Sequence, residues 1–242
     1  MSRKGIVVGG AGGIGKAIVE AARQAGDEVF VLDYCADPGG NFIHCDQSDP
    51  ASVATAFARL DDAFEGAAPH WMIAAASISR RHAVLDADPA TIAELLNVNV
   101  LGTALVTQAA GRRMRDAGGG AIVVITSIAA AQAWLNESFY CVSKAAQGAL
   151  VQALAVELGP HGVRVNAVGP GPVDVSSRDM VSTRGEGQVM ADIIRRTPGR
   201  RLATPHEIAE VALFLTRATW VSGQTVYVDG GYLASGMAGQ DC

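Results

Sequence analysis

Short apolar runs alternate with longer amphipathic segments from one end of the chain to the other. Most of the runs are continuously hydrophobic, which is typical of strands buried on both faces of a parallel sheet. They predict strands at 5–10, 28–33, 41–46, 71–77, 121–127, 162–170 and 224–231. The intervening segments predict helices near 13–25, 50–63, 88–116, 138–158 and 204–217.

Several helix ends carry local signals. Thr204 and Glu207 have the spacing of a capping box, and Asp88 followed by Pro89 is a similar start. Gly26 is placed to close the first helix. With no internal repeat and no long linker, residues 1–242 are predicted to form a single α/β domain, a doubly wound and mostly parallel sheet of the Rossmann type.

Segment 171–203 interrupts this alternation. It is long, polar and rich in arginine, and it predicts a short helix at its centre. Because it follows the carboxyl end of a strand, where ligands bind in such sheets, we interpret it as a substrate lid. The alternative is a solvated surface insertion.

Composition narrows the possible partners. The 19 basic and 24 acidic side chains give a net charge of −5, so there is no basic excess for nucleic acid or an anionic membrane. No apolar run reaches the roughly 18 residues of a membrane span, and the first residues lack a secretory signal pattern. The four cysteines have no metal-ligand spacing. We therefore expect a cytoplasmic protein with free thiols, a small-molecule substrate, no bound metal, and no nucleic-acid or membrane partner.

A glycine-rich turn follows the first predicted strand. Gly9, Gly13 and Gly15 precede the first predicted helix, whose amino end offers free N–H groups to a pyrophosphate. Asp33 ends the second strand, 18 residues after Gly15, where a carboxylate can accept hydrogen bonds from an adenosine ribose. This unit predicts a dinucleotide site.

Asp33 also indicates which dinucleotide binds. A carboxylate would repel the 2′-phosphate of NADP, and neither Gly12 nor Tyr34 supplies a cation for it. The prediction is therefore NAD. Asp46, at the end of the third strand, could contact the adenine edge, or it could cap the following turn in the sequence DQSDP.

Tyr140 and Lys144 form the candidate catalytic pair. The chain has only three lysines, and this one lies four residues after a tyrosine, on the same face of a predicted helix. A phenol has a pKa near 10, and a nearby ammonium lowers it. Ser127 ends the strand 121–127 at the substrate edge of the sheet, where its hydroxyl could hold a substrate oxygen.

In this arrangement the chain resembles the short-chain dehydrogenase/reductase family over nearly its whole length. The motifs that carry the resemblance follow the family's order, and Ser127 precedes Tyr140 by the usual 13 residues. They are Gly9, Gly13, Ile14 and Gly15, then Asp33, Asn99 in NVNVLG, Ser127, Tyr140 with Lys144, Asn166 with GPGPV, and the ending SGQTVYVDGG.

The resemblance implies roles for these residues. Tyr140 would be the general base or acid, Lys144 would lower its pKa and bond the nicotinamide ribose, and Ser127 would orient the substrate oxygen. Asn99 would hold a water that links Lys144 to solvent. Further cofactor contacts would come from Gly12, Ile14, Ala75, Ala76, Pro170, Gly171 and Val173. The family also implies a homotetramer or homodimer.

Three positions depart from the family pattern. Val8 stands in place of a threonine, Ala74-Ala75-Ala76-Ser77 in place of Asn-Asn-Ala-Gly, and Val175 in place of a second threonine. Side-chain hydrogen bonds are lost there, while backbone contacts to the cofactor from Ala75 and Ala76 remain possible.

Two features have open interpretations. Trp134 lies between Ser127 and Tyr140 and is either a pocket wall or a core aromatic. The arginines at 80–81, 178, 184 and 195–196 either bind an anionic substrate or are solvated.

The function that we expect is an NAD-dependent dehydrogenase acting on a secondary alcohol, dihydrodiol or polyol. One alternative is an NADPH-dependent ketoreductase of the 3-oxoacyl carrier-protein reductase type. A non-catalytic nucleotide sensor is the alternative from another class.

Overall fold

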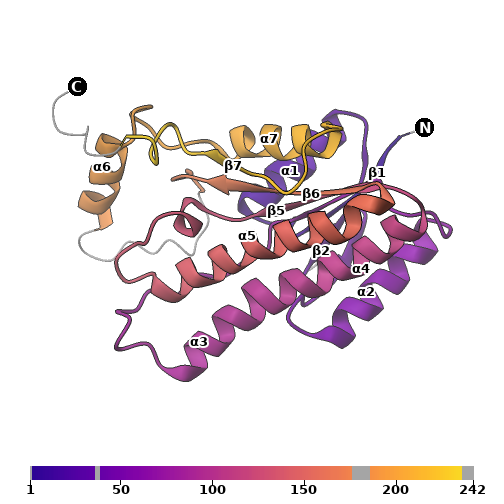
Figure 1. Ribbon diagram of the computed structural model, residues 1–242, viewed down its shortest axis with the longest axis horizontal. Coiled ribbons are helices and arrows are strands. Elements are labelled where there is room, and N and C mark those ends of the chain that lie inside the picture. Colours follow the sequence, from indigo (N-terminus) through magenta and orange to yellow (C-terminus); the bar gives the residue numbers. More distant parts are fainter. Residues whose placement is uncertain (1, 36–38, 176–185, 236–242) are drawn as a thin grey trace.

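The structure is a computed structural model in which residues 2–35, 39–175 and 186–235 are described. These residues form a seven-stranded parallel sheet in the order β3-β2-β1-β4-β5-β6-β7 (Figure 1). The strands are β1 Lys4–Val8, β2 Glu28–Asp33, β3 Phe42–His44, β4 Trp71–Ala74, β5 Gly120–Ile125, β6 Val163–Pro170 and β7 Thr225–Val228. The predicted fold class, a single Rossmann-type domain, is confirmed.

Helices cover both faces of the sheet. They are α1 Gly13–Gln24, α2 Pro50–Ala63, α3 Pro89–Leu96, α4 Thr103–Asp116, α5 Ser138–Leu158, α6 Glu186–Arg196 and α7 Pro205–Arg217, with short helical turns η1 Asn97–Gly102, η2 Ile128–Ala130 and η3 Gly159–His161. In Figure 1, α1 and α7 lie on one side of the sheet and α2, α4 and α5 on the other.

Alternate residues along each strand enter two separate cores. On one face, Ile6 and Val124 pack with residues of α2, α4 and α5. On the other, Val7 and Val123 pack with residues of α1 and α7. Because both faces are covered, the central strands β4 and β5 carry no polar side chain, as the sequence pattern predicts.

Several strands are shorter at their carboxyl ends than predicted. β1 ends at Val8, β4 at Ala74 and β5 at Ile125, two or three residues before the expected ends. The chain leaves the sheet there because the following residues turn into the loops that line the pockets described below. Hydrophobic pattern alone does not separate a strand from the extended loop that continues it.

The long helix predicted at 88–116 is divided. Its middle, η1, is a π-helical turn between α3 and α4. The segment Pro89–Asp116 is long and apolar enough to cross a membrane by length and composition alone, with a mean hydropathy of 1.4 over an 18-residue window. Val106, Ala110 and Met114 explain part of that apolarity, because they are fully buried against the sheet.

The predicted helix ends are confirmed. The hydroxyl of Thr204 accepts a hydrogen bond from the Glu207 amide while the Glu207 carboxylate accepts from Thr204. The Asp88 carboxylate accepts from two backbone amides of α3. Gly26 follows α1 with a φ of +86°, in the left-handed region that glycine tolerates.

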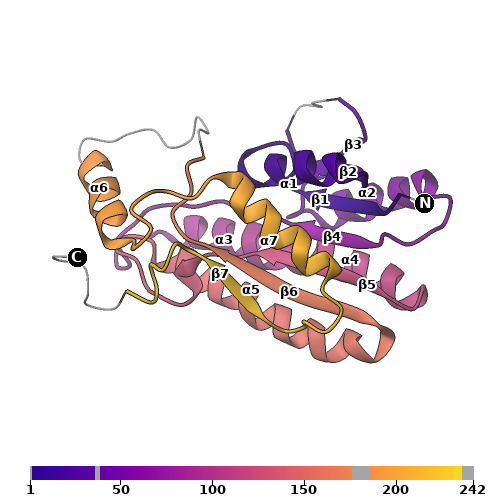
Figure 2. The ribbon, with the colours of Figure 1, turned by 90° about the horizontal axis from the view of Figure 1, so that it is seen from above.

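Segment 171–203 contains the helix that the sequence predicted, α6. Figure 2 shows α6 beyond the end of the sheet, on the side opposite to the first residues of β1. Residues 176–185, with Arg178 and Arg184, lie outside the described part of the chain. The role of the segment as a lid stays a prediction.

Candidate active site

Two neighbouring pockets open at the carboxyl edge of the sheet, and Ser77 lines both. The first, here called the Tyr140 pocket, lies among the ends of β4, β5 and β6, the start of α5, and α6. Its lining includes Ile14, Ala75, Ser127, Trp134, Glu137, Tyr140, Lys144, Pro170, Gly171 and Val173. The second, the Asp33 pocket, lies over β1 and β2 and is lined by residues that include Gly9, Asp33, Asp46, Gln47 and Ala76.

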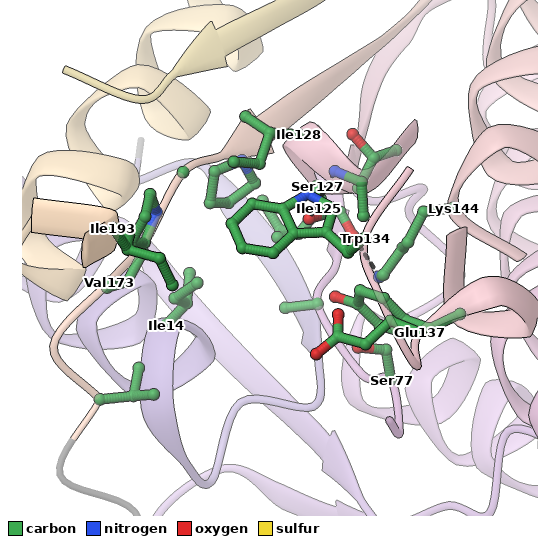
Figure 3. A pocket seen from close by; sticks show the side chains of 18 of the residues that line it. Ile14, Ser77, Ile125, Ser127, Ile128, Trp134, Glu137, Lys144, Val173 and Ile193 are labelled. Atoms are coloured by element: carbon green, nitrogen blue, oxygen red, sulfur yellow. Dashed lines mark hydrogen bonds between the residues drawn. The ribbon is translucent and has the colours of Figure 1, made fainter. Parts of the chain in front are cut away.

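Ser127, Tyr140 and Lys144 all line the Tyr140 pocket (Figure 3). Ser127, two residues after the end of β5, is the N-cap of the η2 turn, and its hydroxyl accepts a hydrogen bond from the Ala129 amide at 3.1 Å. The Lys144 side chain is buried, with Nζ 5.5 Å from the centroid of the Tyr140 ring. Residues from two different elements thus meet at the sheet edge where substrate should bind.

Burial dominates the electrostatics of this pair. It raises the pKa of Tyr140 to about 12, against a smaller lowering by a hydrogen bond with Ser127. Burial also lowers the pKa of Lys144 to about 7. The lysine is itself desolvated, and its Nζ donates to the Ile125 carbonyl at 3.1 Å. The predicted lowering of the Tyr140 pKa requires the protonated amine and stays a prediction.

Asn99 lies in the η1 turn, fully buried, and its polar atoms are all engaged. Its side chain exchanges two hydrogen bonds with the backbone of Ile78, at 2.8 Å each, and donates to Ser143 Oγ at 3.0 Å. Its carbonyl accepts from Gln147 Nε2 and Thr103 Oγ1. These contacts do not test whether Asn99 also holds a water, so the predicted water role stays a prediction. What the contacts do provide is a link from η1 to α5.

The glycine-rich turn fits a dinucleotide pyrophosphate. Gly9 has a φ of +78°, and a Cβ added there would lie 2.5 Å from the Ala76 amide nitrogen. At Gly12, the N-cap of α1, an added Cβ would meet nothing within 4 Å, and no side chain caps the helix. The amino end of α1 therefore faces open space with its N–H groups, which is the geometry that binds phosphate. Ile14, in the first turn of α1, lines the Tyr140 pocket.

Asp33 ends β2 and holds the glycine-rich turn. Its Oδ2 accepts from the Ala11 amide at 3.0 Å and its Oδ1 from the Tyr34 amide at 2.8 Å. A carboxylate has about four lone-pair sites, so it can still accept from ribose hydroxyls. Arg80 also lines the Asp33 pocket, and its guanidinium is paired with the Glu94 carboxylate at 2.8 Å.

Asp46 caps the turn that follows β3, one of its two predicted roles. Its Oδ1 accepts from the amide and the hydroxyl of Ser48, at 2.9 and 2.6 Å. It also lines the Asp33 pocket, so the adenine contact stays open. Ala76 contributes to the same pocket, although its carbonyl already accepts from Gln47 Nε2 at 3.2 Å. Pro170, Gly171 and Val173 line the Tyr140 pocket, as expected of nicotinamide contacts.

Comparison with known proteins gives the family. A family model described as enoyl-(acyl carrier protein) reductase matches residues 9–233. D-threitol dehydrogenase of Mycolicibacterium smegmatis is 34% identical over 249 residues, which cover 94% of this chain and 91% of that protein. The 7alpha-hydroxysteroid dehydrogenase of Escherichia coli K12 is 32% identical over 239 residues, covering 93% and 92%.

Solved structures agree with this result. A short-chain type dehydrogenase/reductase from Mycobacterium marinum superposes with a TM-score of 0.86 at 29% identity, over 95% of each chain. The chain belongs to the short-chain dehydrogenase/reductase family. It is therefore an oxidoreductase of CH–OH groups that uses a nicotinamide dinucleotide, and the predicted family is confirmed.

The structure of this short-chain dehydrogenase bears on the two features whose interpretation the sequence left open, Trp134 and the arginines near the site. Trp134 is a pocket wall. Of the arginines near the site, Arg81 pairs with Glu137, and Arg195 pairs with Asp192. With carboxylates already beside them, these side chains are less suited to an anionic substrate.

Sequence reasoning missed one residue at these pockets. The side chain of Gln47 is buried in the Asp33 pocket and donates to the Val98 and Ala76 carbonyls, while its Oε1 has no partner among the described residues. Glu137, which lies between Ser127 and Tyr140 in the sequence, also lines the Tyr140 pocket.

Proposed function

We propose that the chain is an NAD-dependent dehydrogenase that oxidises a secondary alcohol of a diol or polyol to the ketone. The observation that carries the choice of NAD is Asp33, whose carboxylate lines the second pocket beside the glycine-rich turn. A 2′-phosphate bound there would meet this negative charge, and the neighbouring Arg80 is already neutralised by Glu94.

The residues of the Tyr140 pocket support a simple division of work. Ser127 holds the substrate hydroxyl, and the Tyr140 phenolate takes its proton. The hydride on the same carbon would pass to NAD⁺ when this cofactor is bound, so the alcohol would lose one proton and one hydride and become a ketone. Lys144, in its protonated form, favours the phenolate. The amides at the amino end of α1 would hold the pyrophosphate.

The test of the cofactor is a paired titration. Purified protein is titrated with NAD⁺ and NADP⁺, and a panel of secondary alcohols, diols and polyols is then followed at 340 nm with each. We expect NAD⁺ to be preferred by more than about tenfold, and Asp33→Asn to reduce that preference. Asp46→Asn is the matched control and should leave the ratio unchanged. A preference for NADP⁺ in the wild type would contradict the proposal and favour the ketoreductase alternative.

The quaternary state that the family suggests, a homotetramer or homodimer, is also a proposal. It is supported by apolar side chains left exposed along η1 and α5, among them Leu101, Val142 and Val156 at 45%, 52% and 77%. Light scattering behind a sizing column tests it: a monomer at micromolar concentration would contradict it. A cytoplasmic location is proposed on the sequence grounds given above.

A further inference from the structure

The side chain of Gln47 bridges two segments that are far apart in the sequence. Gln47 lies in the turn after β3 and is buried, and its Nε2 donates to the Val98 carbonyl at 2.9 Å and to the Ala76 carbonyl at 3.2 Å. Val98 belongs to η1, and Ala76 to the loop that follows β4. The Oε1 of the same amide has no partner among the described residues. The contacts of this side chain therefore come from its two N–H donors.

The two acceptors explain why a glutamine stands at this position. Both are backbone carbonyls, so the bridging group has to donate two hydrogen bonds from one point, as an amide nitrogen does. A carboxylate would only accept, and an ammonium would place an unpaired charge in a buried position. The unpartnered Oε1 lowers stability, and such a group in a native protein calls for an explanation.

The loop after β4 forms the wall between the two pockets. Ser77 lines both of them, and Ala76 and Ile78 line the Asp33 pocket. This chain has alanine at positions 74–76, so the start of the loop has no polar side chain of its own. Two side chains from other elements hold it: Gln47 bonds the Ala76 carbonyl, and Asn99 bonds the backbone of Ile78.

The η1 turn forms a second wall of the Asp33 pocket, to which it contributes Asn97 and Val98. It also packs tightly against Gln47. A Cβ added at Gly102, the buried last residue of η1, would lie 2.8 Å from Gln47 Cγ and 3.1 Å from the Gln47 carbonyl oxygen. The side chain of Gln47 is thus fixed by contact as well as by hydrogen bonds, and it joins the two walls of one pocket.

We propose that Gln47 is a positioning residue for the adenosine half of the dinucleotide. By bonding the Ala76 and Val98 carbonyls, it fixes the spacing of the two walls between which that half binds, without touching the cofactor itself. A pocket whose walls are already fixed loses less conformational freedom on binding. This inference rests on the proposed placement of the adenosine half beside Asp33, and it is independent of the identity of the alcohol.

The first arm of the test is a binding measurement on Gln47→Met, which keeps the length of the side chain and removes both donors. Dissociation constants for NAD⁺ and for ADP are measured by calorimetry in the wild type and the variant. We expect both ligands to bind about tenfold more weakly to the variant. Unchanged constants, or a weaker NAD⁺ with an unchanged ADP, would overturn the proposal.

Gln147→Met is the matched control. Gln147, on α5, donates to the Asn99 carbonyl and to Thr103 Oγ1 at 2.8 Å each, and its Oε1 also has no partner among the described residues. The control therefore removes two bonds from the same turn, but at a residue that lines neither pocket. We expect a similar fall in Tm in both variants, with ADP affinity in Gln147→Met within about twofold of wild type. Equal weakening of ADP in the two variants would mean that η1 stability alone matters and would overturn the proposal.

Gly102→Ala tests the same role without changing the amide, and it decides the matter if Gln47→Met does not fold. The added Cβ must displace Gln47, so ADP should again bind more weakly. Gly148→Ala, on α5, is the control because a Cβ added there meets nothing within 4 Å, and ADP affinity should stay unchanged. A Gly102→Ala protein with wild-type ADP affinity would contradict the proposal.

A kinetic arm separates positioning from general support of the fold. With the best alcohol of the panel, Gln47→Met should raise the KM for NAD⁺ by about tenfold and leave kcat at saturating NAD⁺ within about twofold. A fall in kcat with an unchanged KM would overturn the proposal. If no alcohol is oxidised, the proposed function fails, and the ADP dissociation constants decide the present inference.

Discussion

Asp27, at the amino edge of the sheet, and Lys144, at the carboxyl edge, are both buried charged side chains, but they are partnered very differently. Asp27 accepts from Trp71 Nε1 and lies 3.9 and 3.8 Å from the guanidinium groups of Arg3 and Arg217. Lys144 donates to one backbone carbonyl and has no ion pair within the described ranges. The partners of Asp27 compensate for the desolvation of its carboxylate. The desolvation of the Lys144 ammonium is largely uncompensated.

The same contrast extends to neighbouring groups at each edge. At the amino edge, Arg3 and Arg164 donate to the Leu215 and Thr216 carbonyls at the end of α7, where a cation also complements the helix dipole. At the carboxyl edge, the pocket residues Gln47 and Trp134 each keep a buried atom that has no partner within the part of the chain that the structure describes. The amino edge therefore stabilises the fold, and the carboxyl edge holds polar groups ready for ligands.

Among the variants that test this difference between the two edges, Lys144→Met should have the largest effect on activity. We expect Lys144→Met to lower kcat/KM by about a thousandfold, because the phenolate loses its nearby ammonium. It should also raise Tm by several degrees, at roughly 2–4 °C per kcal/mol for a chain of this size, because a poorly compensated buried amine is removed. Lys16→Met, on the exposed Lys16–Glu20 pair, is the control and should change neither value. A Lys144→Met protein that is less stable than the wild type would contradict this account.

The stability gain should depend on pH. The pKa of Lys144 falls from 10.5 to about 7 on folding, so between these values the unfolded chain binds more protons than the folded one. Stability contributed by this group therefore rises with pH across that window. The Tm difference between Lys144→Met and wild type should shrink from pH 7 to pH 10, as measured by calorimetry.

Removing Asp27 tests the other edge. Asp27→Ala removes the hydrogen-bond acceptor of the Trp71 N–H and leaves two guanidinium groups without their buried partner. We expect a loss of about 3 kcal/mol in the free energy of unfolding, measured by urea denaturation, with kcat/KM at 15 °C within about twofold of wild type. Asp116→Ala, at an exposed pair with Arg115, should cost less than about 0.5 kcal/mol. Loss of activity without loss of stability in Asp27→Ala would break the proposed division between the edges.

The pH profile gives a smaller and graded effect. Because burial holds the pKa of Tyr140 at about 12, most tyrosine is protonated at neutral pH, and oxidation needs the phenolate. Lys144, with a pKa of about 7, loses its proton above pH 7, so the kcat/KM for alcohol oxidation should rise from pH 6 to 7 and then level off up to pH 9, whereas ketone reduction, which needs the phenol, should not rise. Initial rates in both directions check this. An oxidation rate that falls over this range would rule out a tyrosine base.

Much of the fold could be predicted from the sequence because its signals are local. Continuous apolar runs marked the strands, and the caps at Asp88 and Thr204 marked two helix starts. The π-helical turn at 97–102 could not be predicted, because it depends on contacts from far along the chain: Gln147 on α5 donates to the Asn99 carbonyl. No local pattern encodes such a contact.

The candidate site divides in the same way. Ser127, Tyr140 and Lys144 were found by spacing and lie together in one pocket. The protonation state of Tyr140 and Lys144 was not predictable, because their pKa values depend on burial, which comes from packing between elements. Likewise, the unpartnered atoms of Gln47 and Trp134 appear only when every neighbour is known.

The most direct test of the whole account is Tyr140→Phe, which removes one hydroxyl and keeps the ring. Its kcat/KM on the best alcohol of the panel is measured with NAD⁺, together with the NAD⁺ dissociation constant and Tm. The account predicts a fall of about a thousandfold in kcat/KM, with NAD⁺ affinity within about threefold and Tm within about 3 °C of wild type. A variant that keeps more than about a tenth of wild-type kcat/KM would contradict the assignment of Tyr140 as the group that takes the substrate proton.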